Sequence, residues 1–556
     1  MAGDRSAGSG AEEPGRAGVV PVAPTRSDAV PRALARLVGG PQGEHAAAPR
    51  GRGVALRVLI ALAVLSCTLG WIQKAPCRDV RTWVHDKQYT SVCYSDVSAL
   101  YGVEGLIHGQ LPYVDHPVEY PVVIGAVMEL ASAVTDVLAP APTAGVDVNA
   151  QETARYATFF DVTTLLMAIG VLVTVVATGL TAARRRVWDA ALVALAPTVV
   201  LHLSTNWDMI AVALTSVGML LWARRRPVPA GILLGLGLAT KLYPILVLLA
   251  LVPLCLRAGR LRAFGRTAAA AAVAVLGVYL PSYLVAASFT TAGVRTGGSP
   301  LADLGSSGLA ALAPHRGAGL NATLRFLQLN TVRPADWDSL YFQLQEAMGR
   351  PLDLGSTPAR LNALTAILFL AVLCGIGWLT LAAPRRPRVP QVAFLLVVAF
   401  LLTSKVWSPQ YVLWLVPLYA LARPRWGAFL AWQATEAILL VTRFLYFTHR
   451  DYATSGVTQG WFFAAVLLRD LVLLALCVLV VREVWFPELD AVRRTPTAAG
   501  TGYEDDPAGG VLDGAPDVLV LRGTPGPGAA AGPGPGGTAP APWEEPAAAG
   551  PSTPTR

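Results

Sequence analysis

Long apolar blocks separated by short arginine clusters constrain this chain more than any other feature of its sequence. Segments 54–72, 157–182 and 460–482 are apolar around the whole circumference of a helix, so each needs lipid or other helices on every side. Because a helix needs roughly 20 apolar residues to cross a bilayer, the pattern predicts an all-α polytopic membrane protein with about 12 transmembrane helices (roughly 11 to 13).

Composition agrees with a membrane protein, since 54% of the 556 residues are hydrophobic and 14% are charged. The basic residues comprise 40 arginines and four lysines, which indicates a high-GC bacterial genome. The formal charge of +8 sits mostly in short loops, where cytoplasmic positive charge is expected. No basic helix is interleaved with aromatic residues, so we expect no nucleic-acid partner.

The arginine clusters fix the expected topology, because short basic loops stay on the cytoplasmic side. They are Arg184 to Arg186, Arg224 to Arg226, Arg257 to Arg266, Arg385 to Arg388, and Arg423 with Arg425. We therefore expect a bacterial plasma-membrane protein with both termini in the cytoplasm. Its membrane domain spans 53–486, between tails 1–52 and 487–556 that are rich in Ala, Gly and Pro and predicted to be disordered.

Two segments between basic clusters are too short for two full crossings. Residues 228–256 carry TKLYP at their centre, and residues 390–422 carry TSKVWSPQY. A helix of about 14 residues rises about 21 Å, less than the roughly 30 Å hydrocarbon core. Each segment is predicted to form a short helical hairpin whose polar tip lines a cavity below the outer surface.

Other spans are expected at 188–204 and 207–223, joined outside by LSTNWDM. Segment 118–138 is ambiguous, because the loop after it contains no Lys or Arg. We interpret it as a re-entrant or interfacial helix on the outer side. The alternative is that it crosses the membrane fully, as a thirteenth span.

The expected outer loops are 73–117 and 289–357. In the first, Asp96 precedes an amphipathic pattern, which predicts a helix along the membrane surface with the carboxylate near its start. From spacing alone, Asp96 is either a simple helix cap or a catalytic group, and Glu104, Asp115 and Glu119 read as solvated. The second loop is predicted to contain interfacial helices that form a lid or an acceptor groove.

Cys77 and Cys93 share the first outer loop, where a disulfide would persist and would fix the backbone entering Asp96; the alternative is two unpaired thiols. Lys241 and Lys405 lie at the two hairpin tips, where a cation is costly unless it meets an anion. A lipid-linked phosphate fits both positions, although the lysines could instead snorkel or pair with carboxylates. Asn206 and Asp208 could bond sugar hydroxyls or pair with a lysine.

Charged residues also lie within predicted spans, where they are expensive. They are Asp161, Glu436, Arg443, Arg469 and Asp470, and we expect Arg469 and Asp470 to pair structurally. The chain has no Walker loop, no HExxH, no GxSxG and no Cys or His cluster of metal spacing. We therefore expect no metal and no cofactor.

An ordered set of motifs resembles a known family. The motifs are CYSDVSALYG with GQLPY and EYP, then NWD, GLGLATKLYP, ADWDSLYF and SKVWSPQYVLWLVPL. They resemble the polyprenol-phosphate-dependent membrane glycosyltransferases of family 87, formerly a domain of unknown function, which include bacterial mannosyltransferases. The resemblance covers 54–486 and leaves out both tails.

The resemblance implies a GT-C glycosyltransferase fold and a hexosyltransferase that uses a polyprenyl-phosphate sugar, with mannose suggested by the family. It implies a catalytic aspartate in the first outer loop, which by position is Asp96, acting as general base with inversion. Lys241 and Lys405 would bind the donor phosphate. The candidate substrate-binding residues are Tyr94, Glu119, Tyr120, Asn206, Asp208, Tyr243, Gln410 and Tyr411.

The implied partners are the lipid-linked donor, a lipid or glycan acceptor of the cell envelope, and membrane lipids. Two rival interpretations are a transporter or flippase of a lipid-linked sugar, which also uses broken helices, and a non-catalytic scaffold. Neither the sugar, the acceptor, the linkage nor the oligomeric state follows from the sequence.

Overall fold

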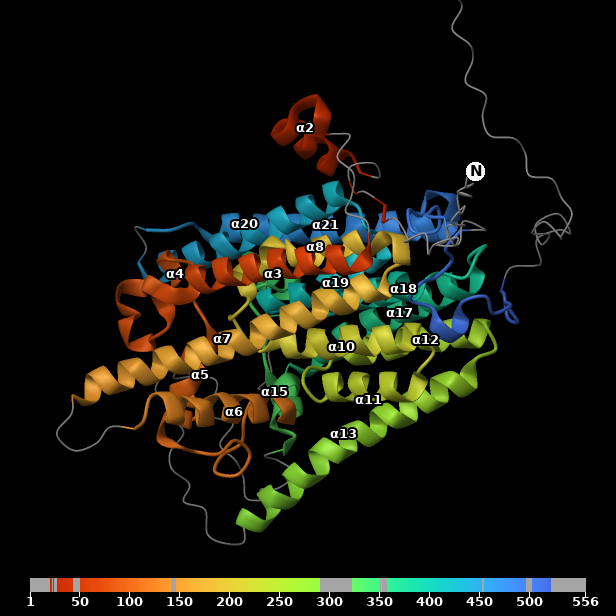
Figure 1. The fold of residues 1–556 in the computed structure, drawn as a ribbon. Coiled ribbons are helices and arrows are strands. Elements are labelled where there is room, and N and C mark those ends of the chain that lie inside the picture. The colour runs from red at the N-terminus through yellow and green to blue at the C-terminus, as the bar shows by residue number, and fades with distance from the viewer. Residues whose placement is uncertain are drawn as a thin grey trace, which may run out of the picture.

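The computed structural model describes residues 21–22, 24, 28–43, 51–141, 147–290, 323–350, 352, 358–452, 455–496 and 503–521. Within these ranges the chain is helical, and two isolated β-bridges are the sole extended pairings. Figure 1 shows the long helices side by side in one bundle, with α13 (Leu261–Thr290) leaving it at an angle.

Six helices in the described part are long and apolar enough to cross a membrane. They are α3 (Arg52–Lys74), α7 (Val148–Thr181), α13, α17 (Ala359–Ala382), α20 (Trp426–Asp451) and α21 (Gln459–Trp485). Their side chains are mostly apolar, which suits contact with lipid on one side and helices on the other. The predicted all-α polytopic membrane fold is confirmed, while the number of crossings stays a prediction.

Two helical hairpins are shorter than a full crossing, as predicted. The first joins α11 (Pro227–Leu238) to α12 (Pro244–Arg257). The second joins α18 (Val389–Thr403) to α19 (Val412–Ala422) through a 3₁₀ turn. Helix α12 packs against α18, so the two hairpins lie together. Their four helices have 11 to 15 residues and rise about 17 to 23 Å, which leaves the tips inside the bundle.

The predicted span 188–204 is not one helix. The chain there forms a 3₁₀ helix (Arg184–Ala190) and the short helices α8 (Ala191–Ala194) and α9 (Pro197–His202). Pro197 explains the break, because proline has no N–H to donate and disfavours helical geometry at the residue before it. The chain then turns at 203–207 into α10 (Asp208–Ala223), which does match its predicted span.

Helix α6 (Val122–Leu138) covers the ambiguous segment. At its start, the Val123 N–H donates to the carbonyl of Ala239 at the first hairpin tip, 3.2 Å away. At its end, Arg155 in the early turns of α7 bonds Asp136 and the carbonyl of Ala139. Helix α6 therefore runs between the depth of the hairpin tip and the first turns of α7, which favours the re-entrant interpretation over a full crossing.

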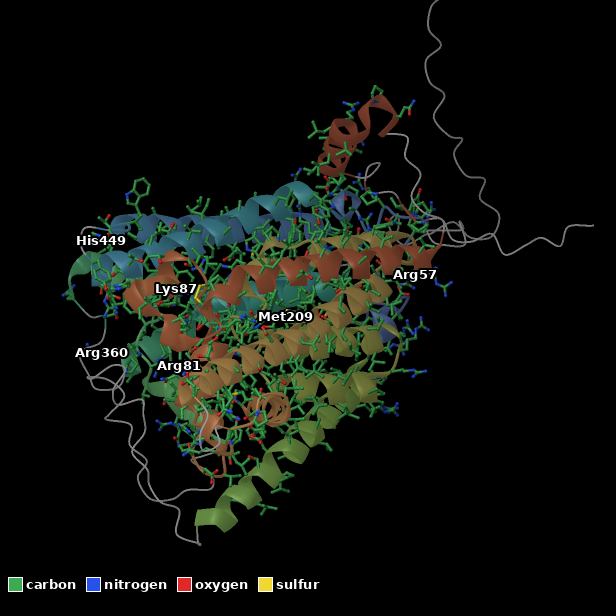
Figure 2. The ribbon with its side chains drawn as sticks, turned by 60° about the vertical axis from the view of Figure 1, so that its left-hand side comes forward. Arg57, Arg81, Lys87, Met209, Arg360 and His449 are labelled. Atoms are coloured by element: carbon green, nitrogen blue, oxygen red, sulfur yellow. A yellow bond between two sulfur atoms is a disulfide. The ribbon has the colours of Figure 1, made fainter. Side chains whose placement is uncertain are left out.

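The molecule has two chemically different ends. We call the end that carries the arginine clusters the arginine end, and the end that carries residues 75–121, 325–348, 451–452 and 455–459 the loop end. In Figure 2, Arg57 marks the first, whereas Arg81, Lys87, Arg360 and His449 mark the second. Met209, next to the NWD motif, lies between them, so this motif is inside the bundle and not on an outer surface.

The loop end is built from short helices packed onto the bundle. They are 3₁₀ turns at Ala75–Cys77, Val80–Thr82, Val84–Asp86 and Leu106–His108, and helices α4 (Lys87–Thr90), α5 (Asp96–Val103), α15 (Arg325–Val332) and α16 (Leu340–Met348). Helix α5 was predicted along the membrane surface, but it packs against α7, with Tyr101 stacked on Phe159 at 4.2 Å. Its apolar residues are therefore buried against protein.

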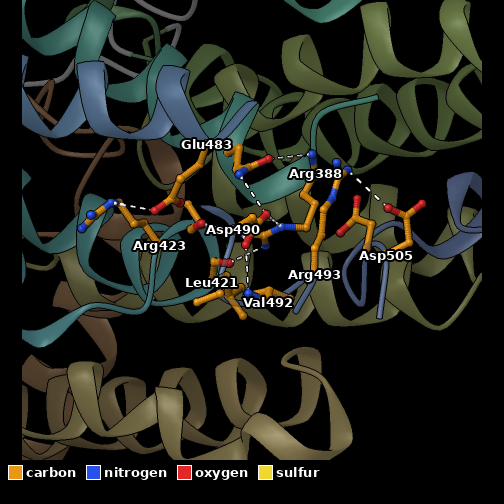
Figure 3. A network of polar contacts seen from close by, with 12 residues as sticks. Arg388, Leu421, Arg423, Glu483, Asp490, Val492, Arg493 and Asp505 are labelled. Carbon is orange, nitrogen blue, oxygen red and sulfur yellow. Dashed lines mark hydrogen bonds and ion pairs between the residues drawn. The ribbon is translucent and has the colours of Figure 1, made fainter. Parts of the chain in front are cut away.

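Parts of both predicted disordered tails are ordered. Helix α2 (Ala29–Gly43) precedes the first span, and Asp28 accepts from the Trp426 N–H. After Leu489, residues 490–496 and 503–521 fold back onto the arginine end. Figure 3 shows Asp490 paired with Arg388 and Asp505 paired with Arg493. The composition predicted disorder. Acidic residues of the tail instead form ion pairs with arginines at the ends of the membrane helices.

Candidate active site

Asp96 is the first residue of α5, and the structure holds it by its backbone as well as its side chain. Its N–H donates to the carbonyl of Thr205, in the turn between α9 and α10, at 2.9 Å. Ser95 before it donates its hydroxyl to the carbonyl of Ser204. Cys77 and Cys93 form a disulfide, with their Cα atoms 5.6 Å apart, three residues before Asp96. The carboxylate is therefore anchored to the NWD turn.

Asn206 of the NWD motif orients the Asp96 carboxylate. Its Nδ2 donates to Asp96 Oδ2 and to the Tyr120 hydroxyl oxygen, both at 2.8 Å. Its Oδ1 accepts from Lys241 Nζ at 3.2 Å and from the backbone of Trp207. Asn206 therefore fixes one oxygen of the Asp96 carboxylate, and the Tyr94 side chain also forms a hydrogen bond with Asp96.

Lys241 at the first hairpin tip is an ion-pair partner of Asp208, at 3.4 Å. Asp208 is fully buried and also accepts from the Trp414 indole at 2.8 Å. The ammonium lies 4.9 Å from the Tyr120 ring centroid and 5.8 Å from that of Tyr411. Lys241 thus supports Asn206 from behind, and Asp208 compensates for its charge.

Lys405 at the second hairpin tip contacts the late loop. Its Nζ donates to the carbonyl of Arg333 at 2.6 Å, and its own carbonyl accepts from the Asp336 N–H. Arg333 in turn donates to Glu119 at 2.7 Å. These contacts join the hairpin tip, the ADWDSLYF motif and the EYP motif into one wall near Asp96.

A cavity of about 260 Å³ opens beside Asp96 at the loop end. It is lined by Tyr89, Tyr94, Asp96, Thr205, Trp337, Ser408, Pro409, Gln410, Leu440, Arg443, Phe444, Phe447, Arg450 and Asp451. Of the predicted site residues, Asp96, Tyr94 and Gln410 line it. In the described part of the chain, no group of three or more His, Cys, Asp or Glu side chains is arranged to hold a metal ion.

The remaining predicted residues lie around this cavity, some in contact with Asp96 and others farther away. Asn206 contacts Asp96 directly, and Tyr120 reaches it through Asn206. Glu119 is held by Arg333, and Tyr411 stacks on Trp414 at 4.1 Å. Tyr243 is almost fully buried and stacks on the other side of Trp414 at 4.7 Å, so it packs the interior near Asp208.

Electrostatics at the loop end favour a neutral tyrosine beside Asp96. The negative charge of Asp96, together with burial, raises the pKa of Tyr94 well above its usual value, so this phenol keeps its proton. Burial raises the pKa of Asp336 to about 6, although the Arg443 guanidinium opposes the shift. Burial likewise raises the pKa of Glu119, and Arg333 opposes it.

Sequence reasoning did not assign a role to Arg443, although it recognised the residue as an intramembrane charge. Its Nη1 pairs with Asp338 at 2.7 Å, and the guanidinium lines the cavity. Lys74, at the end of α3, was also missed: it is fully buried and donates to the carbonyl of Tyr94 at 2.9 Å. Lys74 is one of only four lysines in the chain, and this rarity could have marked it as a candidate. The predicted Arg469–Asp470 pair is confirmed, at 2.7 Å.

The structure combines apolar helices long enough to cross a membrane with an anchored carboxylate in a cavity at one end, and we compared the chain with known proteins. The profile of Glycosyltransferase family 87 matches residues 138–409, just under half of the chain. The resemblance to family 87 predicted from the motifs is therefore confirmed over this part of the chain. Comparison with curated proteins finds no significant match.

Two solved structures are distantly similar. The crystal structure of ArnT from Cupriavidus metallidurans bound to undecaprenyl phosphate shares 12% identity, with 78% of this chain and 77% of that chain covered, at a TM-score of 0.37. The Archaeoglobus fulgidus oligosaccharyltransferase, tethered to an acceptor peptide, shares 14% identity at a TM-score of 0.33. The match covers 77% of this chain and about 55% of the oligosaccharyltransferase's length.

Proposed function

We propose that this protein transfers a hexose from a polyprenyl-phosphate sugar to a hydroxyl of a lipid or glycan acceptor, with Asp96 as the general base. The observation that carries the proposal is the Asp96 carboxylate in the cavity wall, with one oxygen held by Asn206 at 2.8 Å. The family match supports glycosyl transfer, and the membrane-embedded site suits a donor that stays in the bilayer.

The chemistry balances without a further reactant. Asp96 Oδ1 accepts the proton of the acceptor hydroxyl as its oxygen forms a bond to the anomeric carbon. The bond from that carbon to the phosphate oxygen breaks, and the lipid phosphate leaves from the opposite face with inversion. The leaving phosphate keeps its charge, so it needs a nearby cation more than it needs a proton. We keep Lys241 and Lys405, predicted from the sequence, as candidates for that cation.

The direction of the chain across the membrane is part of the proposal. The arginine end carries the basic clusters that remain cytoplasmic in most membrane proteins. The loop end, with its disulfide and its cavity, then faces the extracytoplasmic side of a bacterial plasma membrane, and the chain acts on the cell envelope. Mannose is the sugar that the family suggests, and the described end segments (28–43, 490–496 and 503–521) lie on the cytoplasmic side.

A reconstitution experiment tests transfer against transport. The purified protein is placed in liposomes with a radiolabelled polyprenyl-phosphate hexose and a set of envelope lipids and glycans as acceptors. The proposal predicts a labelled covalent product that has the inverted anomeric configuration. Movement of the labelled lipid between leaflets with no covalent product would instead support a flippase.

A further inference from the structure

The cavity beside Asp96 contains a cation that the lysine hypothesis did not consider. Lys241 is compensated by Asp208, and neither Lys241 nor Lys405 is among the residues that line the cavity. The Lys405 ammonium donates a hydrogen bond to the carbonyl of Arg333. Arg443 of α20 lines the same cavity as Asp96.

Arg443 is held in place by an ion pair, and its guanidinium has further N–H groups that can donate hydrogen bonds. Its Nη1 pairs with Asp338, which is fully buried, and its Nε has no hydrogen-bond acceptor among the described residues. A guanidinium carries five N–H donors in a rigid fork, so one ion pair leaves several for a second anion. The side chain is 14% exposed, which limits competition from water.

The ADWDSLYF motif and α21 hold Asp338, and thereby Arg443, in position. The carbonyl of Asp338 accepts from Arg469 Nη2 at 2.6 Å, and Arg469 lies over the Trp407 ring at 3.5 Å. Asp336 donates its N–H to Lys405. The motif therefore links the second hairpin, α20 and α21 around one guanidinium, which is the arrangement that preorganised electrostatic stabilisation requires.

Arg443 lies about two turns inside the loop-end terminus of α20. It lies eight residues before Asp451, the last residue of α20, which is about 12 Å along a helix. Aromatic rings make up much of the rest of the cavity wall: Tyr89, Tyr94, Trp337, Phe444 and Phe447. The cavity volume of about 260 Å³ is enough to admit a hexose with its phosphate.

We propose that Arg443 binds the phosphate of the polyprenyl-phosphate sugar and that the aromatic wall packs against its hexose. This inference rests on the proposed function, since it assigns the donor headgroup to the cavity that contains Asp96. A bidentate guanidinium would hold the phosphate before transfer and stabilise it as it leaves.

A binding measurement tests the assignment apart from catalysis. Undecaprenyl phosphate without a sugar is titrated into the protein in phosphatidylcholine nanodiscs. The wild type should bind it, whereas Arg443→Gln should bind at least tenfold more weakly. Arg443→Lys should lie between them, because it keeps a charge without the fork. Arg350→Gln, which removes an exposed guanidinium at the end of α16, should bind as the wild type does.

Loss of binding must be separated from loss of folding and from other phosphates. Removing Arg443 alone leaves Asp338 buried without its ion-pair partner, so the double variant Arg443→Gln with Asp338→Asn is measured with it. The proposal predicts weak binding with a wild-type melting temperature for the double variant, and no competition by excess phosphatidylglycerol. Tight binding in both variants, or efficient competition by phosphatidylglycerol, would overturn it.

The two proposals fail in different ways. Normal transfer and normal lipid binding by Arg443→Gln would refute the role of Arg443 and leave the proposed function standing. Arg443-dependent binding of undecaprenyl phosphate by a wild type that forms no glycosidic product would refute transfer and leave the phosphate site standing.

Discussion

At the scale of single residues, the site depends on one amide that serves several partners. Asn206 donates from one nitrogen to Asp96 and to Tyr120, and accepts from Lys241 on its oxygen. Asp208 behind it neutralises Lys241 and receives the Trp414 indole N–H. The NWD motif therefore orients the Asp96 carboxylate through Asn206.

Asn206→Ala tests that support. A hydrogen bond to a charged group contributes about 1.5 to 3 kcal/mol, so we expect kcat to fall roughly 10- to 150-fold. Because Asn206 acts through Asp96, the KM for the acceptor should change little. Steady-state kinetics in nanodiscs measures both, and Asn362→Ala, which loses an exposed contact to Thr331, is the control. An unchanged kcat with a raised KM would contradict the positioning role.

At residue scale, the sequence located Asp96 because the CYSD motif and the polar loop mark it locally. It could not assign Arg443, because the residue gains its meaning only when α20, the ADWDSLYF motif and α5 meet at one cavity. The sequence also could not show which way Tyr243 points. The KLYP motif places it close to Lys241 in the chain, which suggested a site residue, but its ring stacks on Trp414 in the interior.

At the scale of elements, apolar length predicted the spans and short hairpins well, because the bilayer imposes it locally on each helix. Two elements differ for non-local or stereochemical reasons. Pro197 breaks the expected span at 188–204, and α5 is buried against α7 where a surface helix was expected. The first outer loop is accordingly a packed element whose geometry sets the position of Asp96.

The disulfide should control the order of that loop. Cross-linking two residues 16 positions apart stabilises the folded loop by about 3 kcal/mol in the chain-entropy account. We expect the double variant Cys77→Ser with Cys93→Ser to show faster amide exchange over 78–95 and several-fold lower turnover while remaining inserted. Hydrogen exchange by mass spectrometry measures this, with Cys374→Ser, an exposed free cysteine, as control. Unchanged exchange in the loop would contradict the expectation.

At the scale of the whole molecule, the two ends differ in the residues they carry and in how they are covered. The loop end holds the cavity, and the arginine end is closed by the C-terminal segment. Arg388 and Asp490 are each about 1% exposed there, and Arg388 also donates to the carbonyls of Leu421 and Ala422 (Figure 3). The Pro- and Gly-rich composition could not predict this, because the partners are about a hundred residues apart and pair only in the folded chain.

Asp490→Asn should destabilise the arginine end. Breaking a buried ion pair leaves Arg388 without compensation, and such losses cost about 3 to 5 kcal/mol. We expect a melting temperature lower by several degrees in detergent, with sugar transfer at the loop end retained below that temperature. Glu488→Gln, an exposed carboxylate two residues earlier, provides the control. Equal melting of both variants would show that the docked segment does not stabilise the fold.

The central claim is that the Asp96 carboxylate takes the proton from the acceptor hydroxyl, and Asp96→Asn tests it most directly. The variant keeps the size of the side chain and can still bond Asn206 and the backbone turn, so we expect normal insertion and normal donor binding. We predict that product formation, measured with saturating labelled donor and acceptor, falls at least a thousandfold, while Asp115→Asn on the exposed part of the same loop transfers as the wild type does. Transfer by Asp96→Asn at a wild-type rate would contradict the account.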